Sequence, residues 1–110
     1  MLMASAATAA DSRYSSVAAN VDFNAVIELS FRDSDHTLSY GDDQFQFGKL
    51  WLPDSVAPAK ALLIMIHGGC WLNQFDMEHT YPFSTALADA GYAVWSLEYR
   101  RTGDPGGGWP

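Results

Sequence analysis

Five consecutive residues offer the most recognisable chemistry in this sequence. They are His67, Gly68, Gly69, Cys70 and Trp71. The apolar run 61–66 stops directly before them, which is typical of a buried strand that ends in a tight turn. Two adjacent glycines let peptide N–H groups approach a bound molecule closely. Preorganised N–H donors stabilise the oxyanion that develops during acyl transfer, so the pattern predicts an oxyanion-binding turn.

We expect the backbone of this turn, rather than its side chains, to take part in catalysis. We expect His67 to brace the turn rather than to carry protons. Cys70 would need an activating base to serve as a nucleophile, and the sequence assigns it none, so a loop or packing cysteine is favoured. The histidines at 36, 67 and 79 lack the spacing of metal ligands, and neither a metal nor another cofactor is predicted.

Composition limits the class of protein and its partners. The chain has 110 residues, enough for one small domain, and 48% of them are hydrophobic. The formal net charge is −7 and the only adjacent basic pair is Arg100–Arg101, so no nucleic-acid partner is expected. No apolar run approaches the roughly 20 residues of a membrane span, so no membrane partner is expected. The single cysteine excludes an intrachain disulfide.

Residues 1–24 are rich in alanine and serine and show little periodicity, so we expect a weakly ordered tail. No basic residue precedes the apolar part of this segment, which disfavours a secretory leader. A cytoplasmic location is therefore expected, with secretion as the weaker alternative. Residues 25–110 are expected to form the folded part of the chain.

Two strands are predicted in the first half of the folded part. Residues 26–31 alternate apolar and polar side chains, as a half-buried strand does. Residues 33–43 hold four aspartates and are expected to form a solvated turn. Residues 45–52 form the second predicted strand. Its apolar phase shifts at Gly48, and a glycine at such a shift suggests a β-bulge.

The second half predicts a strand–helix–strand unit. Residues 60–66 are apolar without alternation, as in a strand covered on both faces. Residues 78–90 carry an apolar stripe at helical spacing, with Pro82 in the first turn and Gly91 as the stop signal. Residues 92–99 form a fourth strand. Such a unit implies a parallel strand pair with a right-handed crossover, so the expected fold class is α/β, with antiparallel strands ahead of the crossover.

Three segments match a known pattern in order and spacing. They are the His-Gly-Gly-x-Trp motif at 67–71, the strand-like stretch 90–101 and the glycine-rich stretch 106–110. Together they resemble the α/β-hydrolase esterases, including the carboxylesterase and kynurenine formamidase branch, from about residue 45 to the end of the chain. The resemblance implies that backbone N–H groups of the turn form the oxyanion hole of a serine hydrolase that acts on carboxylic esters or aryl formamides. The implied donors are Gly68, Gly69 and Cys70.

That family also requires a serine on a G-x-S-x-G elbow, followed by an acid and a histidine. Ser39, Ser84 and Ser96 each lack the two flanking glycines, so no nucleophile or triad is predicted in this chain. The resemblance places the elbow on a fifth strand, beyond Pro110. We therefore expect an incomplete hydrolase sheet, inactive alone, whose complete enzyme binds a small ester or amide. The oligomeric state is left open.

Other interpretations remain alongside this one. The chain could be a non-catalytic binding or interaction module that retains half of the hydrolase fold. A nucleotide-binding half-domain is weaker, because the glycines at 106–108 lack the Gly-Lys-Ser/Thr of a phosphate loop. The pair Arg100–Arg101 could bind a substrate carboxylate, although a solvated pair at the strand end is favoured. An in-frame G-x-S-x-G after Pro110 would separate the enzyme from the binding module.

Overall fold

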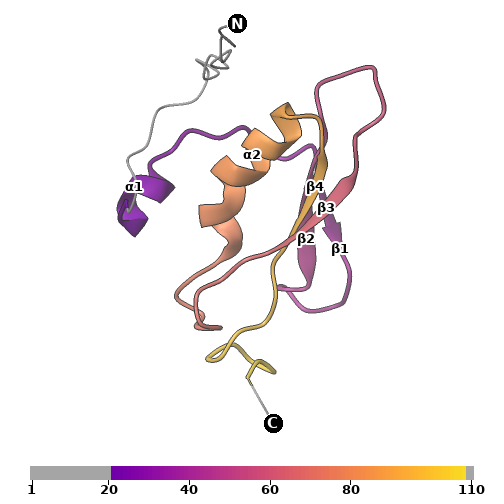
Figure 1. Cartoon of the computed structure of the whole chain (residues 1–110). Helices are drawn as coiled ribbons and strands as arrows, with labels where there is room; N and C mark the ends of the chain where they lie inside the picture. Colours follow the sequence, from indigo (N-terminus) through magenta and orange to yellow (C-terminus); the bar gives the residue numbers. More distant parts are fainter. Residues whose placement is uncertain (1–20, 109–110) are drawn as a thin grey trace, which may run out of the picture.

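Four strands form one mixed sheet, and the longest described helix packs on one of its faces (Figure 1). The computed structural model describes residues 21–108. In chain order the elements are α1 (Phe23–Ile27), β1 (His36–Ser39), β2 (Phe47–Trp51), β3 (Leu62–Ile66), the 3₁₀ turn η1 (Met77–Thr80), α2 (Tyr81–Asp89) and β4 (Ala93–Leu97).

The strand order in the sheet is β1-β2-β4-β3. β1 and β2 are antiparallel, β2 and β4 are antiparallel, and β3 and β4 are parallel. The helix α2 lies between β3 and β4 in the chain, so the predicted antiparallel strands followed by a strand–helix–strand unit are confirmed. Because parallel strands end at the same edge of a sheet, the loops that follow β3 and β4 emerge together.

The core lies between α2 and the sheet. Trp51 on β2, Ala88 on α2 and Val94 on β4 are fully or almost fully buried. The indole Nε1 of Trp51 donates a hydrogen bond to the carbonyl oxygen of Arg32 at 2.9 Å. A buried tryptophan removes about 150–250 Å² from water. Trp51 therefore anchors the segment before β1 to the centre of the molecule.

The helix prediction is confirmed, with η1 forming its first turn. Pro82 lies in the first turn of α2, where its missing N–H leaves no helix bond unmade. Gly91 follows the helix with φ +97°, and its N–H donates to the carbonyl of Ala88 at 2.9 Å. Glycine adopts this backbone readily and so ends the helix where predicted. Among the described residues, no helix has both the length and the apolar character that crossing a membrane requires.

The strand predicted at 26–31 is wrong. The helix α1 occupies the start of that segment, capped by the Asp22 side chain, which accepts a hydrogen bond from the Ala25 N–H at 2.9 Å. Further on, the Phe31 ring packs edge-on against Tyr81 with ring centroids 5.3 Å apart. Phe31 therefore contacts a side chain rather than continuing a sheet, and alternation alone does not separate the two cases.

The first strand instead lies inside the predicted polar turn 33–43. All four residues of β1 are exposed, and the strand is defined by its backbone pairing with β2. The turn itself is shorter, with the Tyr40 N–H donating to the Gln46 carbonyl at 2.9 Å. Polar composition is compatible with an edge strand because its side chains face water. Of the predicted tail 1–24, residues 1–20 lie outside the described part, and α1 begins at residue 23.

The predicted bulge at Gly48 is also wrong. Gly48 pairs in unbroken register with Leu38 on one side and Leu97 on the other. A Cβ atom at position 48 would lie 1.9 Å from Nε1 of Trp95. The glycine therefore marks a close approach of the Trp95 ring rather than an extra residue.

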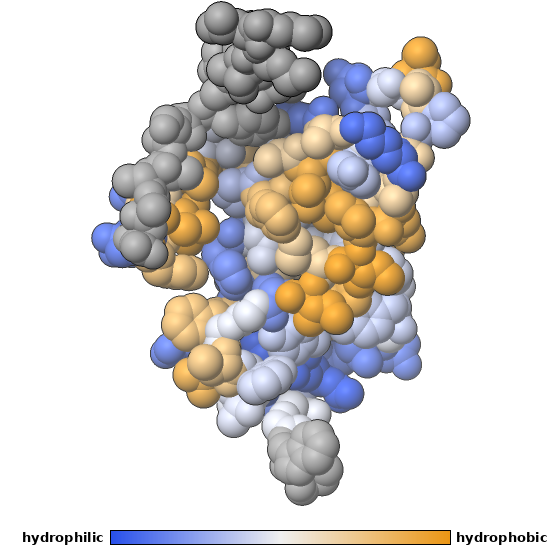
Figure 2. All heavy atoms as spheres, viewed as in Figure 1, coloured by the Kyte–Doolittle hydropathy of each residue, from blue (hydrophilic) through white to orange (hydrophobic). Residues whose placement is uncertain are grey.

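Within residues 21–108, one face of β3 is bare. Leu62, Ile64 and Ile66 are 57%, 59% and 66% exposed. Figure 2 shows apolar side chains gathered on the side of the molecule where β3 lies. The expectation that this strand is covered on both faces is therefore wrong for the described residues.

Candidate active site

The glycine turn lies where the loops after β3 and β4 emerge together. Leu72 and Thr102 form a parallel bridge between these loops. The Thr102 N–H donates to the carbonyl oxygen of Trp71 at 2.8 Å. The turn is thus held at the carboxyl end of the parallel strand pair, the edge at which open α/β sheets bind ligands.

The backbone of the turn is unusual over three consecutive residues. Gly69, Cys70 and Trp71 have φ angles of 121°, 54° and 56°. Positive φ in a residue other than glycine costs about 1–3 kcal/mol, and such strain tends to gather at functional sites. Among the described residues, no acceptor engages the N–H groups of residues 68–71. The turn therefore presents a row of unengaged donors, as an oxyanion hole requires.

Of the two glycines, only Gly69 has a steric reason to be present. A Cβ atom at Gly69 would lie 2.6 Å from the Cβ atom of Phe75, whereas one at Gly68 would meet nothing within 4 Å. Gly69 is therefore required by both its φ angle and its packing. At Gly68, the surrounding space would accept a small side chain.

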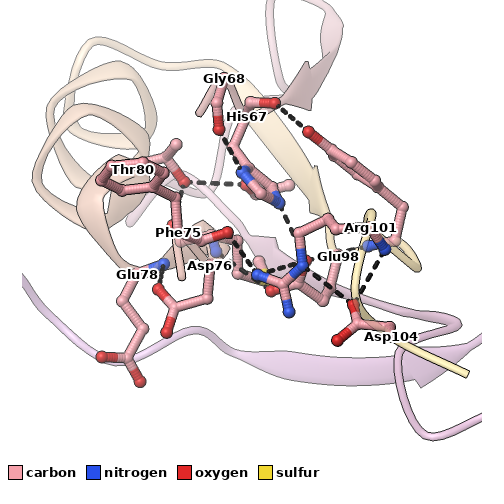
Figure 3. Close-up of polar contacts among 12 residues, drawn as sticks. His67, Gly68, Phe75, Asp76, Glu78, Thr80, Glu98, Arg101 and Asp104 are labelled. Carbon is pink, nitrogen blue, oxygen red and sulfur yellow. Dashed lines mark hydrogen bonds and ion pairs between the residues drawn. The ribbon is translucent and has the colours of Figure 1, made fainter. Parts of the chain in front are cut away.

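His67 is buried and lies directly beneath the turn (Figure 3). Its Nδ1 lies 2.8 Å from the carbonyl oxygen of Gly68, and its Nε2 lies 2.8 Å from Oε1 of Glu98. Its ring stacks on Tyr99 with centroids 4.4 Å apart, and the Tyr99 hydroxyl donates to the His67 carbonyl at 2.7 Å. Both ring nitrogens of His67 thus face oxygen atoms. His67 therefore joins the turn to Glu98 and Tyr99, and the bracing role expected for it stays a prediction.

Glu98 is the centre of this buried network. Its carboxylate accepts hydrogen bonds from His67, from the Tyr99 N–H at 3.0 Å and from the Met77 N–H at 3.1 Å. Burial alone would raise the pKa of the Glu98 carboxyl, but these three hydrogen bonds outweigh burial and lower its pKa below the ordinary 4.5. Glu98 is therefore held ionised opposite the His67 ring.

Arg101 is part of the same network, which corrects the expectation of a solvated arginine pair. It is only 4% exposed. Its guanidinium lies 3.6 Å from Glu98 and 3.3 Å from Asp104, and it donates to the carbonyl of Phe75 (Figure 3). A buried charge is tolerated when it is paired and hydrogen-bonded in this way. Arg100, in contrast, is exposed.

The sequence-predicted turn residues thus come together, but the residues that hold them were missed. Glu98 and Tyr99 fall within the predicted strand 92–99, and Arg101 falls in the arginine pair that follows it. The sequence does contain a sign of this network. Glu98 and Arg101 carry opposite charges, are three positions apart and follow the apolar strand β4, which pairs in parallel with β3. Their burial could be recognised only once both loops were placed at one edge.

The cysteine and serines that the sequence disfavours as nucleophiles have simpler surroundings. Cys70 is exposed and unpaired with another cysteine. Ser96 is fully buried, with its hydroxyl 3.0 Å from that of Thr80, and Ser84 is fully buried on α2. Within residues 21–108, no group of three His, Cys, Asp or Glu side chains could hold a metal ion.

The parallel unit and the glycine turn at its edge define a protein class, the α/β-hydrolase-like esterases. The sequence model of the BD-FAE family, an esterase domain of this kind, matches residues 48–106, more than half of the chain. The chain belongs to the BD-FAE family.

A solved structure agrees with this assignment. A protein of Silicibacter sp. tm1040, provisionally named a thioesterase, is similar with a TM-score of 0.52 and 27% sequence identity. The similarity covers 61% of this chain and 26% of that one, so the chain spans about a quarter of that protein's length. No curated protein gives a significant match.

Proposed function

We propose that this chain supplies the oxyanion hole of a serine hydrolase that cleaves carboxylic esters or aryl formamides. The observation that carries the proposal is the strained turn whose N–H groups at residues 68–71 have no acceptor among the described residues. Membership of the BD-FAE family supports the hydrolase class. The ester or formamide substrate is an inference from the motif.

In the proposed reaction, a serine outside residues 1–110 attacks the carbonyl carbon while a histidine takes its proton and an acid orients that histidine. The carbonyl oxygen gains negative charge in the tetrahedral intermediate. The N–H groups of Gly68, Gly69 and Cys70 donate hydrogen bonds to this oxygen. His67 and Glu98 do not touch the substrate in this scheme, because they hold the turn from beneath.

The test is hydrolysis of p-nitrophenyl acetate and formanilide by the full-length gene product that contains residues 1–110. We expect turnover of at least one of these substrates by a product that carries a G-x-S-x-G elbow. Residues 1–110 alone should give no turnover above buffer, because no serine in them lies on such an elbow. Turnover by residues 1–110 that Cys70→Ala abolishes would contradict the proposal.

A variant of the turn tests the oxyanion role in the same assay. Gly69→Ala should lower kcat by about 10²–10³-fold with a smaller change in KM. The substitution displaces an N–H donor, and this donor stabilises the transition state more than the bound substrate. Val56→Ala, in an exposed loop outside the site, is the control and should keep wild-type rates. An equal loss of kcat and of substrate binding would argue that the turn only shapes the pocket.

A further inference from the structure

The two adjacent arginines after β4 have opposite environments. Arg101 is buried between Glu98 and Asp104, which neutralise its charge. Arg100 is exposed, and among residues 21–108 no hydrogen bond or ion pair engages its guanidinium. A guanidinium carries five donors and prefers to bind carboxylates or phosphates through two of them. Arg100 is therefore a cation with its hydrogen-bonding capacity unused.

Arg100 lies beside the glycine turn. It lines a cavity of about 470 Å³ together with Cys70, Trp71, Arg101, Thr102 and Gly108. Such a volume lies in the range of small-molecule sites. The side chain is placed by the turn after β4, because a Cβ atom at Gly106 would lie 2.9 Å from Nη1 of Arg100. The same cavity thus holds two residues of the glycine turn and an unengaged cation.

The negative net charge of the chain does not prevent an anion from binding beside Arg100. The formal net charge is −7, so the surface as a whole repels anions. Exposed charges are screened beyond about 8–10 Å at physiological salt, so the local guanidinium rather than the net charge decides what binds in the cavity. Arg101 adds no net positive charge, because its two carboxylate partners, Glu98 and Asp104, outweigh it, and neither of these carboxylates lines the cavity. The cavity therefore favours a ligand that carries negative charge.

We propose that Arg100 is a specificity-determining residue that binds a carboxylate on the substrate, so that the preferred substrates are esters or amides that also carry a free carboxylate. This inference rests on the proposed function for the identity of the scissile bond. The carboxylate pairs with the guanidinium, and the scissile carbonyl is thereby placed near the N–H groups of Cys70 and its neighbours.

The test is binding of monomethyl succinate, an ester with a free carboxylate, compared with dimethyl succinate, its neutral analogue. Binding to the 110-residue chain is followed by amide chemical-shift changes in two-dimensional NMR, with attention to Cys70 and Trp71. We expect the wild type to bind the monoester at least about tenfold more tightly, as a charge-assisted hydrogen-bond pair would give. Equal affinity for the two esters would overturn the proposal.

Variants of Arg100 keep the test specific. Arg100→Gln should bring the affinity for the monoester down to that for the diester, Arg100→Lys should retain part of the preference, and Arg100→Glu should reverse it. Lys60→Gln removes one positive charge at the other end of β3 and should leave the preference unchanged. Dispersed spectra of each variant would show that its fold is kept. If Arg100→Gln keeps the preference for the monoester, another group causes that preference and the proposal is overturned.

The two proposals fail in distinguishable ways. Hydrolysis of p-nitrophenyl acetate by the gene product, without any preference for the monoester in binding, would remove the role of Arg100 alone. An Arg100-dependent preference for the monoester, without hydrolysis of any ester, would remove the proposed reaction alone.

Discussion

At the scale of single residues, Glu98 supports the glycine turn through its hydrogen bond with His67. It joins the loop after β4 to His67 beneath the turn and to the N–H of Met77 at the start of η1. Its backbone carbonyl also accepts from the Tyr40 hydroxyl at 2.7 Å. The Glu98 carboxylate thus links His67 and Met77 to the loop after β4, and the Glu98 carbonyl links Tyr40 to the same loop. Removing one member of such a network leaves the others without partners.

Glu98→Gln should destabilise the protein in a pH-dependent way. A carboxyl whose pKa is lowered on folding stabilises the fold above its unfolded pKa, and this contribution is lost as pH falls through the folded pKa. For Glu98 the contribution is full above the ordinary value of 4.5 and is lost below it. Near neutral pH we expect the variant to lose about 1–3 kcal/mol of unfolding free energy, because the buried partners lose their ionised acceptor.

Urea unfolding at neutral pH and at a series of pH values below 4.5 measures this difference. The gap between the wild type and Glu98→Gln should narrow as pH falls, because the wild-type carboxylate becomes protonated. Glu28→Gln, at an exposed position, is the matched control and should follow the wild type. A gap that stays constant through the acid range would contradict the assigned role of the Glu98 charge.

At the scale of elements, the packing of β2 against β4 depends on the absence of one side chain. Gly48 on β2 lies directly beneath the Trp95 ring of β4. The indole Nε1 is buried and has no hydrogen-bond partner in the described part of the chain. The contact between Gly48 and the Trp95 ring is thus steric.

Gly48→Ala should destabilise the fold by about 1–3 kcal/mol, because a methyl group must displace the ring of Trp95. The cost should shrink in a Trp95→Leu background, where the clash is absent. A double-mutant cycle measured by urea unfolding gives the coupling between the two positions. Additive losses would show that the glycine serves some other purpose, such as backbone freedom in β2.

At the scale of the whole molecule, the described residues leave apolar surface on the sheet face that contains Leu62, Ile64 and Ile66. β3 is also the edge of the sheet next to β4, so its outer backbone groups have no strand to pair with among residues 21–108. Exposed apolar faces and open edges promote association between chains. Residues on both faces of β3 are apolar, and for this reason the sequence pattern of the strand suggests that both faces are covered.

The 110-residue chain should therefore self-associate through this face. Sedimentation velocity should show a mass that rises with concentration for the wild type, and Ile64→Lys should shift the population toward monomer. Val56→Lys adds the same charge at a fully exposed loop residue and is the control. A wild type that stays monomeric at all concentrations, or equal effects of the two lysines, would count against this face.

Local patterns in the sequence determined much of the local structure. The apolar runs at β2, β3 and β4, the stripe of α2 and the stop at Gly91 follow from periodicity and from backbone preferences, which act over a few residues. The glycine turn was recognisable for the same reason, because its chemistry resides in consecutive residues.

Only the tertiary structure decided what holds the turn and what faces its cavity. The contacts of His67 with Glu98, the burial of Arg101 and the exposure of Arg100 depend on two loops about 30 residues apart meeting at one sheet edge. The sequence also left open which segment pairs as β1, because an exposed edge strand is defined by a neighbour's backbone rather than by its own side chains. Pairing partners and burial are properties of the assembled sheet, and short-range patterns carry little information about either.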